Sequence, residues 1–152
     1  MFWVKTLILY ESKMGFTKKC ADYLYNKISD SDIYDIENEK FNLNDYDKIL
    51  IGAPIYKGKL EKITKKFVSN NKFLLLEKKL GVFCAGMNSK EFHTAVQDSL
   101  PPNVFYHAEI VHCGGVIDYK KLNIKEKLTL WRRLKIRKSE ELEKLDSLDS
   151  LI

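Results

Sequence analysis

Long apolar runs, separated by stretches of helical spacing, set the pattern of this chain. Residues 3–9, 48–53 and 80–86 are almost wholly apolar, which is typical of strands buried on both faces of a sheet. Residues 32–37 predict a shorter strand. Residues 104–115 predict a further buried strand, or a long strand with an irregularity. The pattern therefore predicts five strands.

Helical spacing fills the intervals between these runs. After the first run, apolar side chains recur every three or four positions, at Phe16, Cys20, Ala21, Leu24 and Ile28. Residues 60–70 and 89–99 predict two more helices. Strands that alternate with helices imply crossover connections, and hence a parallel sheet with helices on both faces. We therefore expect an α/β protein, a doubly wound three-layer sandwich.

Length and composition are those of a single domain, residues 1–152, with a packed core. Hydrophobic residues make up 45% of the chain, yet no apolar run approaches the length of a membrane span. No basic residue precedes the first apolar run and no small-residue cleavage site follows it, so we expect no signal peptide. Three scattered cysteines predict reduced thiols and a cytoplasmic protein without a bound metal.

Charge is concentrated near the C-terminus. Residues 120–138 hold nine Lys or Arg and one acid, Glu126, whereas the last fourteen residues hold one Lys and five acids. We expect a basic helix at about 123–137 and a short acidic helix at about 139–151. The basic stretch 120–138 has three interpretations: a solvated face of the helix that covers the sheet, a peripheral contact with the inner face of a membrane, and nucleic-acid binding. No nucleic-acid-binding motif accompanies it, so we expect no nucleic-acid partner.

Three strand ends carry the candidate chemistry, because ligands of such sheets bind beyond the carboxyl ends of the strands. The first end is Ser12-Lys13-Met14-Gly15-Phe16-Thr17, which opens a helix. Its glycine, hydroxyl groups and helical N–H groups suit a phosphate, with Lys13 or Lys18 adding charge. An ordinary helix start capped by Ser12 explains the same residues.

The second and third ends suit a flat ring. The second strand is expected to stop at Pro54, so that Ile55, Tyr56, Lys57 and Gly58 form a loop with an exposed aromatic platform. Tyr56 packed down onto the domain is the alternative. The third end has small residues at 85 and 86, which leave room for a ring edge, although an ordinary turn capped by Asn88 or Ser89 fits as well. Together the three ends predict a site for a flat heterocycle with one phosphate.

In these motifs the chain resembles the flavodoxins, a family of domains that bind flavin mononucleotide (FMN). The family's phosphate loop reads Ser/Thr-x-Ser/Thr-Gly-x-Thr, which Ser12, Gly15 and Thr17 match, while Met14 replaces one hydroxyl residue. The segments IGAPIYKGK and CAGMN resemble the family's second and third loops. The resemblance implies a five-stranded parallel sheet of order 2-1-3-4-5, with non-covalent FMN and electron transfer. The implied FMN-binding residues are Ser12, Lys13, Met14, Gly15, Phe16, Thr17, Pro54, Ile55, Tyr56, Lys57, Gly58, Ala85, Gly86 and Met87.

The stretch GGVIDYKKLN (114–123) and the basic helix after it are similar to a narrower branch, the flavodoxin-like protoporphyrinogen oxidases that use quinone. Three functions follow from the two resemblances. The first is an electron carrier that docks to a redox partner protein, and the second is an oxidase of protoporphyrinogen with quinone as acceptor. The third is a flavodoxin fold that has lost FMN and serves as a binding module, which only Met14 supports.

The second loop is basic. Typical flavodoxins, in contrast, resemble one another in having acidic residues around the flavin. Lys57, Lys59 and Lys62 lie in or just after it, and no acid occurs between Pro54 and Leu60. Positive charge near the ring favours the reduced, anionic flavin. We therefore predict a bound flavin that is less reducing than in a typical flavodoxin.

Overall fold

The computed structural model describes residues 4–11, 15–38, 40–56, 58–86, 90, 92–117, 123–134 and 140–152. Within these ranges the sheet order is β2-β1-β3-β5-β6-β7, with β4 paired to β3 alone. Strands β2, β1, β3, β5 and β6 are parallel to their neighbours, whereas β4 and β7 are antiparallel to theirs. The strands are β1 (Thr6–Tyr10), β2 (Ser31–Asp35), β3 (Lys48–Tyr56), β4 (Lys59–Leu60), β5 (Lys79–Ala85), β6 (Glu109–Ile117) and β7 (Glu140–Glu143).

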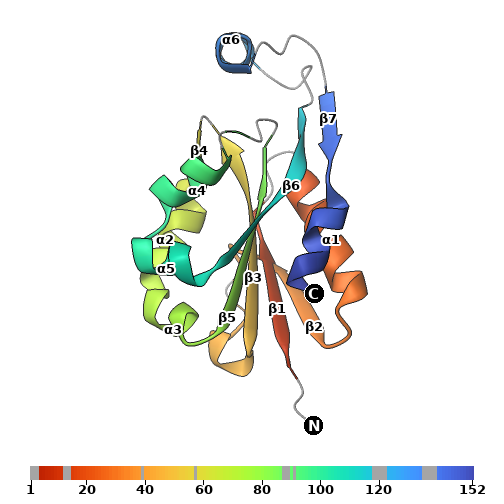
Figure 1. Ribbon diagram of the computed structural model, residues 1–152, viewed down its shortest axis with the longest axis vertical. Helices are drawn as coiled ribbons and strands as arrows, with labels where there is room; N and C mark the ends of the chain where they lie inside the picture. Colours follow the sequence, from red (N-terminus) through yellow and green to blue (C-terminus); the bar gives the residue numbers. More distant parts are fainter. Residues whose placement is uncertain are drawn as a thin grey trace.

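Helices cover both faces of this sheet (Figure 1). On one face lie α2 (Lys62–Asn70), α3 (Lys72–Leu76), α4 (Phe92–Ser99) and α5 (Pro102–His107). On the other lie α1 (Phe16–Lys27) and the 3-10 helix η3 (Leu145–Leu151). A short 3-10 turn, η1 (Leu43–Asp45), precedes β3, and α6 (Ile124–Leu134) lies beyond the carboxyl end of the sheet. Within the described ranges, no helix is both long enough and apolar enough to cross a bilayer.

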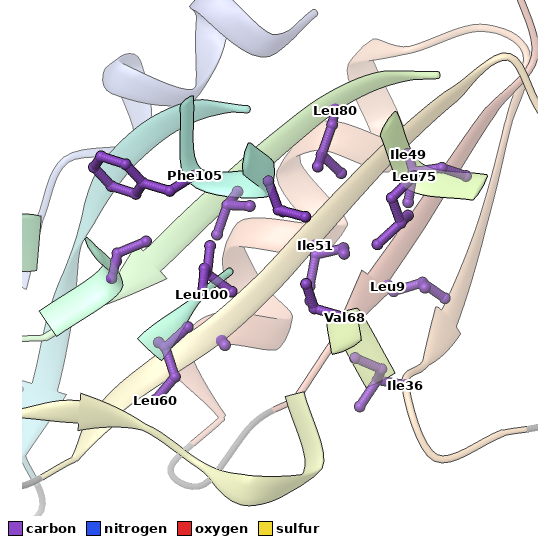
Figure 2. Close-up of a cluster of buried hydrophobic side chains, with 14 of the residues drawn as sticks. Leu9, Ile36, Ile49, Ile51, Leu60, Val68, Leu75, Leu80, Leu100 and Phe105 are labelled. Carbon is purple, nitrogen blue, oxygen red and sulfur yellow. The ribbon is translucent and has the colours of Figure 1, made fainter. Parts of the chain in front are cut away.

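Each central strand buries both of its faces, because its side chains alternate between two hydrophobic clusters. In β1, Leu7 and Leu9 join one cluster and Ile8 joins the other, all three with no exposed surface. Figure 2 shows the first cluster, in which Ile49 and Ile51 of β3 lie among side chains from α2, α3 and α5. Burying one such side chain stabilises a fold by about 1.5–3 kcal/mol. This explains why the strands appear in the sequence as nearly continuous apolar runs.

The predicted fold class is confirmed. The five mutually parallel strands, counted in chain order without β4, follow the predicted order 2-1-3-4-5. The prediction of a strand from residue 104 is wrong, because Pro102–His107 form α5 and β6 begins at Glu109. Pro102 favours the first turn of a helix, and Val104 and Phe105 are buried in the first cluster. The expected irregularity exists as a shift of register between β5 and β6 at Cys84/Ala85.

The C-terminal segment differs from the predicted acidic helix at about 139–151. Glu140–Glu143 form β7, and Leu145–Leu151 form η3. The edge of β6 offers unpaired backbone groups, and β7 satisfies them by pairing antiparallel along Gly114–Ile117. Leu148 and Leu151 of η3 are fully buried beside α1, so η3 covers the face of the sheet that we expected the basic helix to cover. The basic helix itself is present as α6, and residues 135–137 of its predicted range lie outside the described residues.

Candidate functional site

The carboxyl ends of β1, β3 and β5 lie next to one another, as their order in the sheet requires. Tyr10 of β1 pairs with Gly52 of β3, and Pro54 of β3 pairs with Ala85 of β5. Of the predicted site residues, nine are described: Gly15, Phe16, Thr17, Pro54, Ile55, Tyr56, Gly58, Ala85 and Gly86. Ser12, Lys13, Met14, Lys57 and Met87 lie outside the described residues.

The first strand end leads into α1 through a left-handed glycine. Gly15 is the N-cap of α1 and has a φ of 81°. A Cβ placed there would meet nothing within 4 Å, so the glycine is required by its backbone conformation and not by lack of space. Because the N-cap is Gly15, the alternative of a helix capped by Ser12 is wrong. The first N–H groups of α1 have no intrahelical acceptors and carry partial positive charge.

The two residues that open α1 point into the protein. Phe16 is 5% exposed and packs in the second cluster, so only its backbone can take part in a site. Thr17 is 2% exposed, and its hydroxyl has no hydrogen-bond partner in the part of the chain that the structure describes. Buried hydroxyl groups are nearly always hydrogen-bonded, so this one suits a ligand that supplies the missing partner. The Nζ of Lys18 lies 3.1 Å from Asp22 Oδ2, so the positive charge that we expected to add to the loop is already in an ion pair.

Sequence reasoning gave no role to the carboxylate of Glu11, which directly follows β1 and precedes residues 12–17. The Glu11 carboxylate accepts a hydrogen bond from the hydroxyl of Thr64 in α2, and its backbone N–H donates to Gly52 O at 2.8 Å. Burial is the main cause that raises the pKa of Glu11, and the hydrogen bond from Thr64 opposes it. Glu11 therefore ties the end of β1 to both β3 and α2.

The second strand end is a hairpin and not a loop. Strand β3 continues through Pro54 to Tyr56 and then turns back into β4, with Ile55 opposite Leu60 and Tyr56 opposite Lys59. The prediction that the strand stops at Pro54 is wrong. The ladder between β1 and β3 ends at Gly52, so a proline two residues further on costs no bond to β1. Gly58 has a φ of 75°, which suits the tight turn.

Tyr56 reaches out of this hairpin to α6. Its hydroxyl donates to Glu126 Oε2 at 2.7 Å, and its side chain is half-buried. Burial and the hydrogen bond to Glu126 raise the pKa of Tyr56 to about 12, so the phenol stays protonated and donates throughout the physiological range. The alternative in which Tyr56 packs onto the domain is close to what is observed, but its contact is with the basic helix.

Glu126 also builds the start of α6. Its backbone N–H donates to Asn123 Oδ1 at 2.8 Å, and its carboxylate accepts from the Asn123 N–H at 3.3 Å. This reciprocal pair is a capping box, and the pattern Asn-x-x-Glu was visible in the sequence as a helix start. The bond to Tyr56 had no such signal, because nothing in either segment indicates a partner 70 positions away.

The third strand end is held from β6. His112 is 6% exposed, and its Nε2 lies 2.6 Å from Gly86 O, to which it donates. The Gly86 N–H donates to Gly114 O at 2.7 Å. The His112 ring stacks on Phe92, with centroids 4.9 Å apart. Burial lowers the pKa of His112, which favours the neutral ring. Sequence reasoning assigned His112 no role, and an isolated histidine in a strand gave no signal for one.

Small residues at this end serve close packing. A Cβ at Gly115 would lie 2.8 Å from the backbone of Gly86, and a Cβ at Gly86 would lie 3.3 Å from the Cβ of Ile55. Gly86 therefore touches both β6 and the β3–β4 hairpin. The second and third strand ends form one continuous surface, as a site for a flat ring requires.

Comparison with known proteins places this geometry in a family. The model of the flavodoxin domain matches residues 7–143. A curated relative, the flavodoxin-like domain-containing protein BilS of Clostridioides difficile, is 25% identical over 133 residues, which cover 84% of this chain and 76% of the relative. None of these matches supports the resemblance to quinone-dependent protoporphyrinogen oxidases.

Solved structures share the fold. A flavoprotein of Lactobacillus acidophilus in complex with FMN superposes with a TM-score of 0.55 and 22% identity, over 72% of this chain and 91% of its own. The flavodoxin of Fusobacterium nucleatum bound to FMN superposes with a TM-score of 0.56 and 14% identity, over 82% of this chain and 77% of its own. The family match spans most of the chain, from the first strand to the last. The chain belongs to the flavodoxin domain family.

Proposed function

We propose that this protein binds FMN non-covalently at the carboxyl edge of the sheet and passes electrons through it. The observation that carries the proposal is the buried Thr17 hydroxyl at the N-terminus of α1, which has no hydrogen-bond partner among the described residues. A phosphate placed there would accept from Thr17 and from the first N–H groups of α1. Two of the solved structures that share the fold contain FMN, which supports the choice of ligand.

The described residues fit the two ends of such a ligand. The phosphate end has open space at Gly15, where even a Cβ would meet nothing within 4 Å. The hairpin at Tyr56 and Gly58 and the small residues Ala85 and Gly86 offer an edge for a flat ring. Ser12, Lys13, Met14, Lys57 and Met87 complete the predicted set and stay predictions.

Bound FMN would supply one- and two-electron transfer. The chain's own residues would position the flavin and set the charge around it. Thr17 and the start of α1 would hold the phosphate, while the peptide of Gly86, fixed by His112 and Gly114, would line the ring edge. No side chain is required to act as an acid or base.

The charge near the ring differs from what the sequence predicts. Lys59 and Lys62 are exposed beside the hairpin, but α6 brings Glu126 to Tyr56 and so adds a negative group. Glu61, which precedes α2, also acts on Tyr56, so the exposed cations Lys59 and Lys62 are matched there by Glu61 and Glu126. The prediction of a flavin less reducing than in a typical flavodoxin therefore rests on the basic sequence of the second loop, Lys57 included, and a reductive titration with reference dyes measures it. A potential as low as theirs would contradict the prediction.

The first experiment is the visible spectrum of the purified protein, followed by titration of the apoprotein with FMN and with riboflavin. We expect flavin absorption bands, quenched fluorescence and much tighter binding of FMN than of riboflavin, because only FMN has the phosphate. A colourless protein that ignores both ligands would refute the proposal and leave the third function, a binding module. No observation favours oxidation of protoporphyrinogen, and the same preparation tests it with a quinone as acceptor.

A further inference from the structure

Helix α6 turns one side toward the hairpin and the other side away from the protein. At 3.6 residues per turn, successive side chains are rotated by about 100°. Glu126, which bonds to Tyr56, therefore lies about 140–160° around the helix from Ile124, Leu128 and Trp131. These three side chains are 85%, 44% and 36% exposed. The bond to Tyr56 thus places the apolar stripe, Ile124, Leu128 and Trp131, on the side of α6 away from the hairpin, where Ile124 is the most exposed of the three.

Positive side chains lie on one flank of this stripe and at the hairpin on the other side of α6. Lys125 and Arg132 are exposed and lie seven residues apart, so they project from nearly the same side of α6. Lys59 of β4 and Lys62 of α2 are exposed at the hairpin that Tyr56 joins to α6. Within the described ranges, none of these four cations has an ion-pair partner.

The position of α6 gives this surface a role. Figure 1 shows α6 beyond the carboxyl end of the sheet, and the Tyr56–Glu126 bond connects it to the end of β3. The proposed flavin lies at that same end, and a protein that exchanges electrons with it must approach the exposed ring edge. The hairpin cations Lys59 and Lys62 and the basic flank of α6 therefore lie at the end of the sheet that such a partner would approach, with the apolar stripe on the outer side of α6.

We propose that α6 and the β3–β4 hairpin form a docking surface for a redox protein with an acidic patch. The proposal rests on the proposed function, because the flavin defines where the partner must approach. Apolar side chains beside a group of exposed like charges are typical of transient docking, in which the charges speed encounter and the apolar contacts stabilise the complex. The cations Lys59 and Lys62 belong to the body of the protein, which favours a partner that contacts both α6 and the hairpin over a membrane that contacts the helix alone.

Charge reversal tests the proposal. The double variant Lys125→Glu, Arg132→Glu is compared with a control, Lys72→Glu, Lys79→Glu, at the amino end of the sheet. Both lower the formal net charge from +5 to +1. The probe is a reduced plant-type [2Fe–2S] ferredoxin, an acidic protein, and stopped flow follows its reduction of the bound flavin across a range of ionic strength. Cytochrome c, a basic protein that accepts electrons from the reduced flavin, is the probe of opposite charge.

We expect the α6 variant to slow the reaction with ferredoxin about tenfold at low salt, and the control variant less than about twofold. The difference should largely vanish at about 0.5 M salt, where charges are screened. The reaction with cytochrome c should be unchanged or faster in the α6 variant. Equal effects of the two variants on the ferredoxin reaction would overturn the proposal, because net charge alone would then explain them.

Two further measurements separate the remaining outcomes. Cosedimentation with vesicles of phosphatidylglycerol and phosphatidylcholine tests the membrane alternative. The proposal of protein docking would be overturned if the α6 variant loses vesicle binding but still reacts with ferredoxin at an unchanged rate. Calorimetric titration of ferredoxin into the apoprotein tests docking without flavin. If ferredoxin binds the apoprotein in a salt-sensitive way and the α6 variant loses this binding, the docking surface is supported even if the FMN titration fails. The two proposals can therefore fail separately.

Discussion

The Tyr56 hydroxyl donates to Glu126 Oε2 at 2.7 Å, and this one bond joins the β3–β4 hairpin to the start of α6. Glu126 simultaneously closes the capping box with Asn123. The Glu126 carboxylate therefore contributes both to the start of α6 and to its contact with the second strand end. The apolar stripe of α6 lies on the side away from the hairpin because Glu126, on the opposite side of the helix, faces Tyr56.

Replacing Tyr56 by Phe should loosen α6 without unfolding the protein. A hydrogen bond to a charged group stabilises by about 1.5–3 kcal/mol, and this bond attaches only a peripheral helix. We expect amide exchange in residues 124–134 to speed up about tenfold, with little change in the melting temperature. Tyr106→Phe is the control, since Tyr106 is 76% exposed and its hydroxyl has no hydrogen bond within the described residues. Unchanged exchange in α6 would mean that other contacts hold the helix.

Replacing Thr17 by Val should separate stability from ligand binding. Val keeps the shape of the side chain and removes a buried hydroxyl that has no partner among the described residues, so the apoprotein should be at least as stable as the wild type. FMN affinity should fall about tenfold or more, because a hydrogen bond to charged phosphate is lost. Riboflavin affinity should not change. Thermal unfolding and fluorescence titration measure the two effects, with Thr129→Val in α6 as the control.

An equal loss of affinity for FMN and riboflavin in Thr17→Val would contradict a phosphate contact. A loss of apoprotein stability would indicate that the hydroxyl already has a partner. These outcomes are independent, so the variant tests both the geometry at the N-terminus of α1 and the chemistry assigned to it.

Much of the sheet was predictable, because burial on both faces marks every residue of a strand. Leu7, Ile8 and Leu9 are all fully buried, and the run they form is visible without a structure. The glycine before α1 was predictable for a related reason, since Gly15 meets a local backbone requirement at its own position.

The elements that sequence reasoning missed depend on distant partners. Glu140–Glu143 pair with β6 because the edge of β6 is open, which the composition of the segment does not indicate. Tyr56 meets Glu126, and His112 meets Gly86, through contacts that leave no periodic trace. Long-range contacts of polar side chains therefore account for most of what the sequence did not predict at the site.

Replacing Glu11 by Gln should change the pH dependence of stability. The folded pKa of Glu11 is raised above its ordinary value, so folding favours the protonated acid. The contribution of Glu11 is then fully present below the unfolded pKa and is lost as pH rises through the folded pKa. Gln stays neutral and its amide oxygen can still accept from Thr64. We expect the variant to be as stable as the wild type at low pH and more stable at pH 7.

Urea unfolding between pH 3.5 and 8, values chosen to bracket the ordinary pKa of about 4.3 for Glu, measures this difference. The control is Glu77→Gln, an exposed acid at the far end of α3, which should leave the profile unchanged. The Glu11→Gln variant should also bind FMN more tightly at pH 7, because a carboxylate that precedes the phosphate loop is removed. Parallel pH profiles of wild type and variant would show that Glu11 is not desolvated.

We expect His112 to position the peptide of Gly86, so replacing His112 should change the redox potential of the bound flavin. His112→Ala removes the donor to Gly86 O and the stack on Phe92, so we expect a loss of about 2–3 kcal/mol of stability and a shifted flavin potential. His112→Gln retains a donor and should recover part of both.

The folded pKa of His112 is lowered, so its contribution is present above the unfolded pKa of about 6.5 and is lost as pH falls through the folded value. Wild-type stability should therefore decline below pH ~6.5 more steeply than that of His112→Gln, as measured by urea unfolding. If the redox potential of the bound flavin is unchanged in both variants, the role of His112 is limited to packing. If the potential shifts in His112→Ala and is restored in His112→Gln, the hydrogen bond to Gly86 is the contact that affects the flavin.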